Sequence, residues 1–128
     1  MTVRKLIECA GFTPLCLPDP EREISGCYTG DLLSWVMGRA EMGCAWVTIM
    51  TNSNIVAVAS LIDMACIIIS DNCEVDDSIL SLALEKGINI LRSDKPSYET
   101  CTELFKALGK KYTVIFMSTH ACLHAVTI

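Results

Sequence analysis

The sequence lacks the features of two large functional classes. Ten lysine and arginine residues stand against fifteen aspartate and glutamate residues, which gives a net charge of −5. The basic residues are scattered, so the chain has no basic stripe of the kind that neutralises nucleic-acid phosphates. No apolar run reaches the roughly 20 residues that a membrane span needs, since the closest candidate, residues 55–69, contains Ser60 and Asp63. We therefore expect neither nucleic acid nor a membrane as a partner.

A complete catalytic motif is also missing. The sequence contains no G-x-G-x-x-G, and although Gly38 and Gly43 have a Walker-like spacing, Cys44 stands where that motif needs lysine. Asp31 is a candidate base, but an isolated carboxylate without a visible second catalytic group is a poor one. We expect a protein that is not an enzyme, with no catalytic residue and no cofactor.

The cysteines do not form a recognisable disulfide or metal framework. The eight of them include no C-x-x-C pair. Several lie inside apolar runs, where a thiol behaves as a small hydrophobic side chain. His120, Cys122 and His124 would share one face of a strand, and in a helix the two histidines would lie one turn apart. No fourth ligand lies near them, so we expect a packed or frayed terminus and no metal. With no export signal at the amino terminus, we expect the reducing cytoplasm as the location.

What the sequence does contain is one pattern three times: an apolar β-type run, a small polar loop and a helix-patterned stretch. The runs are residues 45–50, 65–69 and 88–91. Strands that alternate with helices favour right-handed crossovers and a parallel sheet. We therefore predict a single α/β domain over residues 1–108, with a mostly parallel sheet flanked by helices.

Other segments add to this framework. Residues 12–17 form an apolar stretch that contains Pro14, which favours either an edge strand or a segment bounded by turns. Residues 23–28 are a second candidate strand, and Asp31 is placed to cap the helix that follows. Residues 55–62 are apolar on nearly every side, so we expect their helix to be covered on most faces. Residues 109–128 form a C-terminal extension, in which residues 112–117 are β-prone and should pair in their own sheet or across a dimer.

The polar loops after the parallel strands should share one edge of the sheet, which is where open α/β sheets bind ligands. The loop from Thr51 to Asn54 carries the strongest signal, because it joins the end of a strand to the start of a helix. There, backbone N–H groups and the helix dipole favour an anion. The alternative is that Ser53 or Asn54 merely caps the helix.

The second loop has a glycine between candidate ligand-binding side chains. Gly30 permits close backbone approach, Tyr28 is able to stack on a ring, and Asp31 is able to accept from a sugar hydroxyl. An ordinary capped turn is the alternative. The full candidate ligand site comprises Tyr28, Thr29, Gly30, Asp31, Thr51, Asn52, Ser53, Asn54, Ser70, Ser93, Ser97 and Tyr98.

The chain resembles the DRTGG domain family over residues 3–108. The resemblance is carried by ISGCYTGDLLSWVM (residues 24–37), AWVTIMTNSNIVAVA (45–59) and GINIL (87–91), and the naming motif survives as Arg22 and Ser25-Gly26-Cys27. It implies a regulatory, ligand-sensing module, a homodimer, and a fold similar to that of the amino-terminal domain of HPr kinase. Members fused to CBS pairs respond to adenine nucleotides, and similar small proteins are encoded beside iron hydrogenase and anti-sigma kinase genes.

Two functions from different classes therefore stand side by side. The first is a noncatalytic regulatory and dimerisation module, whose ligand is a small anion such as a phosphorylated metabolite or an adenine nucleotide. The second is a protein-interaction scaffold for a hydrogenase-associated or anti-sigma signalling partner, with the polar loops acting only as helix caps.

Overall fold

A computed structural model describes residues 1–109, 113–117 and 123–127. Its main sheet has five strands in the order β1-β5-β4-β3-β2. The strands are β1 (Thr13–Cys16), β2 (Gly26–Thr29), β3 (Cys44–Thr48), β4 (Cys66–Ile69) and β5 (Ile90–Arg92). Strands β2 to β5 run parallel, and β1 pairs with β5 in the antiparallel sense. The predicted mostly parallel α/β sheet is thereby confirmed.

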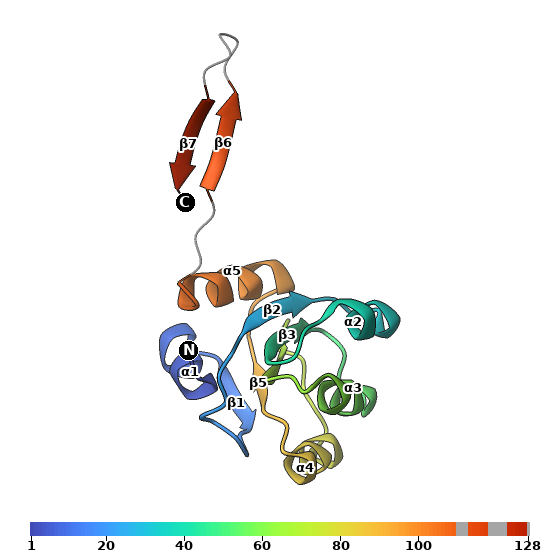
Figure 1. The fold of residues 1–128 in the computed structure, drawn as a ribbon. Helices are drawn as coiled ribbons and strands as arrows, with labels where there is room; N and C mark the ends of the chain where they lie inside the picture. The colour runs from blue at the N-terminus through green and yellow to red at the C-terminus, as the bar shows by residue number, and fades with distance from the viewer. Residues whose placement is uncertain (110–112, 118–122, 128) are drawn as a thin grey trace.

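Helices cover both faces of this sheet (Figure 1). On one face lie α1 (Val3–Ala10) and α5 (Ser97–Ala107). The other face carries α2 (Leu33–Arg39), α3 (Asn54–Ile62) and α4 (Asp77–Lys86). The repeated strand, loop and helix units of the sequence therefore wind around one sheet, as right-handed crossovers require.

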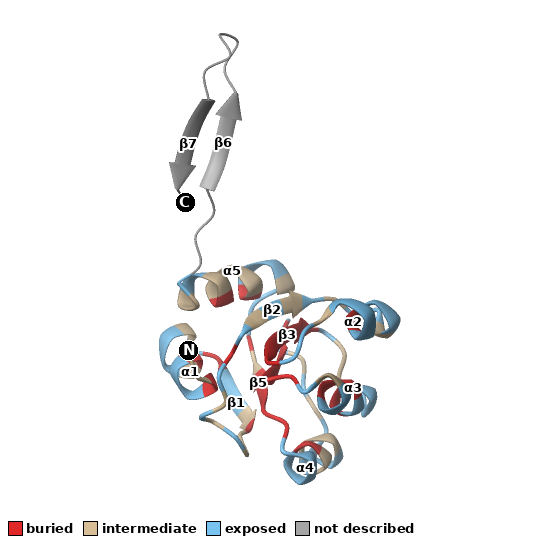
Figure 2. Ribbon diagram, in the orientation of Figure 1, coloured by how far each residue is buried: buried red, intermediate tan, exposed pale blue. Residues whose placement is uncertain are grey.

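The core lies in two layers, one on each face of the sheet (Figure 2). All residues of β3 and β4 are buried, because neighbouring strands cover their edges and helices cover both faces. Alternate side chains point to opposite faces: Trp46 and Ile67 pack towards α2, α3 and α4, and Val47 and Ile68 towards α1 and α5. Near-continuous apolar runs are what a parallel sheet buried on both faces needs.

Three of the cysteines are part of this core, as their positions in apolar runs predict. Cys16, Cys44 and Cys66 are buried, and the described residues contain no disulfide. Burial raises the pKa of the Cys44 thiol to about 11 and that of Cys66 still further, because a thiolate is poorly solvated there. These thiols therefore act as packing groups.

The prediction that the helix of residues 55–62 is covered on most faces is met only in part, because one side of the helix faces solvent. Ile55 and Val56 are buried, but Leu61 is 71% exposed and Ala57 is also exposed. The reason is that α3 lies on the outside of one face of the sheet, so its outer side chains face solvent.

At the edge of the sheet, the segment with Pro14 does form the predicted edge strand. The register of β1 against β5 shifts between Pro14 and Cys16. The candidate strand at residues 23–28 begins later than predicted, because Glu23 makes only an isolated bridge to Thr2 and regular pairing starts at Gly26.

The extension forms β6 (Thr113–Met117) and β7 (Leu123–Thr127), which pair with each other in a separate antiparallel sheet. A β-strand in its own sheet was one of the two predicted arrangements. His120 and Cys122 lie outside the described residues, and of His124 only the backbone is described, so the expectation of no metal there is untested. In the part of the chain that the structure describes, no helix is long and apolar enough to cross a membrane.

Candidate ligand site at the carboxyl edge of the sheet

The polar loops do meet at one edge of the sheet. Because β2 to β5 are parallel, the loops that follow them all leave from the same edge, and backbone hydrogen bonds connect neighbouring strand ends. The Ser70 N–H donates to the Thr48 carbonyl at 3.0 Å, and the Ser93 N–H donates to the Ile69 carbonyl at 2.8 Å. The convergence on which the predicted site depends is therefore present.

Asp31 is not the predicted helix cap. Leu32 occupies the N-cap position of α2 and makes no capping hydrogen bond through its side chain. The Asp31 carboxylate instead accepts from the Thr48 hydroxyl at 2.7 Å and from the Ile49 N–H at 2.9 Å. It lies one residue too early to cap α2, and the neighbouring strand end offers it two donors.

The same loop is also attached to the core. Trp46 is fully buried, and its indole Nε1–H donates to the Gly30 carbonyl at 2.9 Å. The Gly30 N–H donates in turn to the Val47 carbonyl at 3.2 Å. Residues 29–31 are therefore held against β3 by backbone and side-chain bonds, and Trp46 and Thr48 position them. Sequence reasoning missed both residues, because each looks like an ordinary member of an apolar strand.

The loop from Thr51 to Asn54 forms an Asx turn. Asn52 Oδ1 accepts from the Asn54 N–H at 3.0 Å, whereas Ser53 stands at the N-cap position of α3 without a capping hydrogen bond. The start of α3 is thus capped by Asn52, and not by Ser53 or Asn54, which were the alternative candidates for the cap. The side chains of residues 52–54 are exposed, so their remaining donors and acceptors face solvent at the first turn of α3.

Ser70, Ser93 and Ser97 are less exposed than residues 52–54, and their hydroxyls are hydrogen-bonded within the protein. Ser70 and Ser93 are buried at 0% and 2% exposure. The Ser70 and Ser97 hydroxyls bond to each other at 2.7 Å, and Ser93 Oγ accepts from the Thr100 hydroxyl at 2.7 Å. These three serines connect the ends of β4 and β5 to α5, and their hydroxyls already have protein partners.

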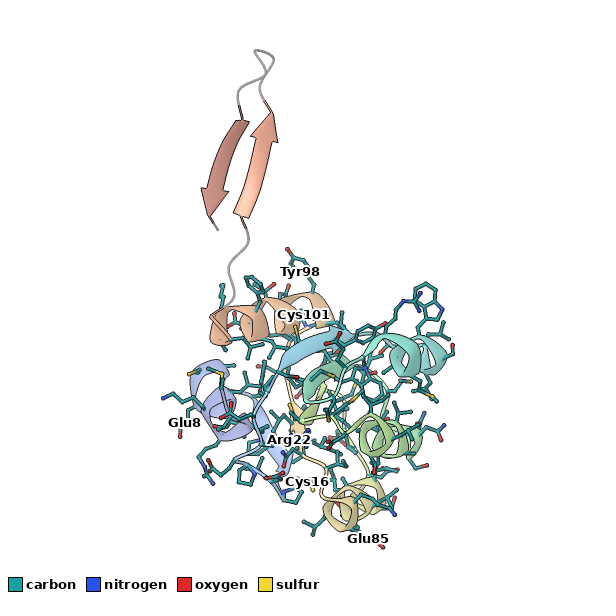
Figure 3. All side chains as sticks on the ribbon, in the orientation of Figure 1. Glu8, Cys16, Arg22, Glu85, Tyr98 and Cys101 are labelled. Carbon is teal, nitrogen blue, oxygen red and sulfur yellow. The ribbon has the colours of Figure 1, made fainter. Side chains whose placement is uncertain are left out.

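The remaining candidates line a groove between β2 and α5, which we call the β2–α5 groove. It encloses about 500 Å³, and its lining consists of Cys27, Tyr28, Thr29, Val47, Tyr98, Cys101, Thr102, Leu104 and Phe105. Tyr98 is 82% exposed and projects from the outer side of α5 (Figure 3). The lining is mostly apolar and contains no lysine or arginine, which suits a ring better than a phosphate.

The structure thus divides the predicted site into three parts. We call the exposed loops 29–31 and 51–54 the rim. Tyr28, Thr29 and Tyr98 belong to the β2–α5 groove, so Thr29 is common to both parts. Ser70, Ser93 and Ser97 form the third part, which connects the ends of β4 and β5 to α5. Among the described residues, no cluster of histidine, cysteine, aspartate or glutamate is suited to hold a metal ion.

The remnant of the naming motif lies away from this site, near the start of β2. Arg22 donates to the Asp63 carboxylate at 2.8 Å and to the Asp63 carbonyl at 2.9 Å. Ser25 Oγ donates to the Met42 carbonyl at 2.7 Å. At the adjacent Gly43, whose φ is +79°, a Cβ would lie 2.7 Å from Ser25 Oγ. These motif residues fix the ends of α3 and of the turn before β3.

The Arg22–Asp63 pair predicts a pH-dependent effect. The hydrogen bond and positive charge of Arg22 lower the pKa of the Asp63 carboxyl, so Asp63 stabilises the fold fully only above its unfolded pKa of about 3.9. That contribution is lost as the pH falls through the lower pKa of the folded state. Urea unfolding between pH 7 and pH 3 should therefore show a stability difference between wild type and Asp63→Asn that shrinks towards pH 3.

Asp71→Asn is the matched control for this experiment. Asp71 is also exposed and also has a positive φ, of 60° against 63° for Asp63, and the described residues contain no ion pair to it. A difference for Asp63→Asn that stays constant down to pH 3 would contradict the role assigned to Arg22.

Comparison with known proteins identifies the family. The DRTGG domain model matches residues 33–107, which is more than half of the chain, and the chain belongs to the DRTGG domain family. Its fold resembles the crystal structure of the CBS and DRTGG domains of the regulatory region of Clostridium perfringens pyrophosphatase, complexed with the activator diadenosine tetraphosphate. The TM-score is 0.66 at 9% identity, over 83% of this chain and 46% of that chain. No curated protein matches the sequence.

Proposed function

We propose that this protein is a noncatalytic regulatory module that senses a small anionic ligand and acts as a homodimer. The observation that carries the proposal is the convergence of exposed hydroxyl and amide side chains at the carboxyl edge of a DRTGG domain. In this proposal residues 1–108 are the sensing domain, and residues 109–128 are an extension to it.

Adenine nucleotides are the first ligands to test. Diadenosine tetraphosphate is the activator in the Clostridium perfringens complex, and the two exposed parts of the site suit the two halves of a nucleotide. The apolar β2–α5 groove with Tyr98 suits the ring, and the first turn of α3, next to Asn52 and Asn54, suits a phosphate. Thr29 lies where the rim and the groove meet.

Ligand binding would act on the rest of the domain through the contacts already described. The rim is tied to β3 by the Asp31–Thr48 and Gly30–Trp46 hydrogen bonds. A ligand that binds one conformation of the rim more tightly raises the population of that conformation. The hydrogen bonds to β3 would carry this change to the neighbouring elements and to the surface that they form.

The test is thermal unfolding in the presence of AMP, ADP, ATP and acetyl phosphate at millimolar concentration. A ligand at about ten times its Kd stabilises the fold by roughly 1.4 kcal/mol, which raises Tm by about 4 °C or more in a domain of this size. We expect the Asn52→Ala/Asn54→Ala double variant to lose this shift. Ser78→Ala, at the exposed start of α4, should keep it. No rise in Tm with any of the four compounds would contradict the proposal.

The interaction scaffold is the second candidate, and exposed apolar side chains favour it. Leu32, Trp35 and Met42, on and around α2, are 61%, 54% and 68% exposed. Tryptophan and methionine are enriched in protein interfaces. If a hydrogenase-associated or anti-sigma partner binds there, the Asn52→Ala/Asn54→Ala variant should bind it as well as wild type does. Loss of that binding would count against the scaffold.

A further inference from the structure

The segment around α2 holds a cluster of exposed apolar side chains. In the described part of the chain eight large apolar side chains are exposed, and half of them lie within residues 32–42. The other four lie one each on α3, α4, α5 and the loop after β3. We use the name α2 face for the exposed uncharged residues of this segment, which are Leu32, Ser34, Trp35, Met37, Gly38 and Met42.

The α2 face is not what attaches the helix to the domain. Val36 is fully buried, and Leu33 and Ala40 pack against the same core layer. These three residues point inward, so the α2 face is left to solvent. The helix lies at the periphery of the domain (Figure 1), and most of its surface is exposed (Figure 2).

Gly38 stands on this face although no described residue requires a glycine there. Its φ is not positive, and a Cβ built on it would meet no atom within 4 Å. Apart from proline, glycine is the residue that a helix interior disfavours most. A large side chain or a backbone from outside the domain is able to approach closely only where no Cβ is in the way.

A large side chain stands directly beside this open position. Gly38 comes three residues after Trp35 and four after Ser34, so the three are neighbours on the helix surface. The Arg39 guanidinium lies over the Trp35 ring, 3.7 Å from its centroid. This contact restricts the indole, and a side chain that is already restricted loses less conformational entropy when it is bound.

We infer that the α2 face is the surface through which two copies of this chain associate, with Trp35 of each copy seated on Ser34 and Gly38 of the other. The inference rests on the homodimer of the proposed function and assigns its interface. In a two-fold dimer both copies contribute the same patch, so the patch must be complementary to itself. A face with a large side chain next to space for one meets that requirement.

The charge of the segment also fits a second copy. Each chain has a net charge of −5, so two copies repel each other and should meet where the surface is close to neutral. Residues 32–42 contain one positive residue, Arg39, and one negative residue, Glu41. Neither has an ion-pair partner among the described residues. In the dimer they are able to pair with each other between copies at the border of the apolar contact.

A different protein on the same face is the alternative, because the scaffold candidate would place its partner there. Exposed tryptophan and methionine suit either partner. The match between Trp35 and Gly38 is reciprocal, however, and a different protein would need only one of the two. The second copy is therefore the better fit.

The first test fills the space at Gly38. Leucine favours a helix more than glycine does, and its Cβ would meet no atom of its own chain, so Gly38→Leu should keep the far-UV circular dichroism of wild type. Analytical ultracentrifugation from about 1 to about 100 μM should show wild type as a dimer. Gly38→Leu should weaken the dimer Kd by about tenfold or more, since Trp35 of the other copy loses its seat.

Ala57→Leu is the matched control, because Ala57 is also a small exposed residue within a helix, on α3. It should remain a dimer. A monomeric wild type would overturn the inference and leave the α2 face to a different protein. Equal dimerisation of Gly38→Leu and wild type, or equal loss of the dimer in Ala57→Leu, would also overturn it.

The second test removes the other half of the contact. Trp35→Ala should weaken the dimer Kd by about tenfold or more as well. Leu84→Ala removes an apolar side chain that is similarly exposed, on α4, and should leave the Kd unchanged. A Trp35→Ala variant that dimerises as tightly as Leu84→Ala would contradict the assigned interface.

Hydroxyl-radical footprinting locates the interface without relying on affinity. At the same concentration, Trp35 should be labelled more strongly in Gly38→Leu than in wild type, because the second copy no longer covers it. Tyr98, which is 82% exposed on α5, should be labelled equally in both. Equal labelling of Trp35 in a dimeric wild type and in the variant would place the contact elsewhere and overturn the inference.

The interface and the ligand site are able to fail separately. The Asn52→Ala/Asn54→Ala variant should remain a dimer while it loses the nucleotide-dependent rise in Tm. Gly38→Leu should lose the dimer and keep that rise. A dimer without any ligand response would reject ligand sensing and leave the interface standing, whereas a dimer that Gly38→Leu does not weaken would reject only the interface.

Discussion

Replacing Trp46 with alanine is expected to lower the free energy of unfolding by about 3–5 kcal/mol. Trp46 is fully buried on β3 and packs in the core layer beneath α2 and α3. Its removal leaves a large cavity, and the Gly30 carbonyl also loses its indole donor. Urea unfolding followed by circular dichroism measures the effect without relying on tryptophan emission.

Two further variants separate the causes of this loss. Trp46→Phe keeps most of the buried ring but lacks the indole N–H, so we expect about 1–2 kcal/mol from the lost hydrogen bond and the smaller volume. Leu84→Ala removes an apolar side chain that is 62% exposed and should change stability by no more than about 0.5 kcal/mol. A loss below 1 kcal/mol for Trp46→Ala would contradict the packing described for β3.

Replacing Asn89 with alanine is expected to cost about 2–4 kcal/mol. Asn89 is 1% exposed. Its amide nitrogen donates to the carbonyls of Asp19 and Ala65 at 2.7 and 3.0 Å, and its Oδ1 accepts from the Asp19 N–H at 2.9 Å. Truncation leaves these buried and half-buried backbone groups without their partner. Urea unfolding again gives the difference in free energy.

Asn89→Asp distinguishes hydrogen bonding from volume. Aspartate has nearly the size of asparagine, but its carboxylate has no N–H with which to donate to the two carbonyls. It should therefore be at least as destabilising as Asn89→Ala at pH 7. Stability close to that of wild type would mean that the side chain contributes by filling space and not by its donors.

Much of the fold follows from local patterns in the sequence. The three apolar runs became β3, β4 and β5, because only a sheet covered on both faces buries such runs completely. Gly87 ends α4 with a φ of 72°, the left-handed conformation that glycine adopts without strain. Pro14 placed its segment at an edge, since proline is unable to donate within a sheet.

Partners distant along the chain were not predictable in this way. Asn89 bonds to Asp19 across 70 positions, and nothing in the residues around Asn89 marks it as anything but one polar residue in an apolar run. In the sequence, Asp31 has the position of an N-cap because it stands just before the residues that form α2. Its actual donors, Thr48 and Ile49, depend on the parallel neighbour that lies beside β2.

The candidate site shows the same division. Parallel strands predicted that the loops share one edge, and the structure places them there. The β2–α5 groove depends on how α5 crosses the sheet, so Cys101, Thr102 and Phe105 were missed although Tyr98 was named. Likewise the burial of Ser70 and Ser93 depends on the close approach of α5, which no local pattern encodes.

The position of β1 has a consequence for how the chain folds. It stands early in the sequence, yet among the described strands its only partner is β5, with Thr13 opposite Arg92, 79 positions later. During synthesis the amino-terminal segment must therefore wait until almost the entire domain has left the ribosome. Long-range closure of this kind slows folding, and it makes completion of the sheet a late step that depends on the last strand.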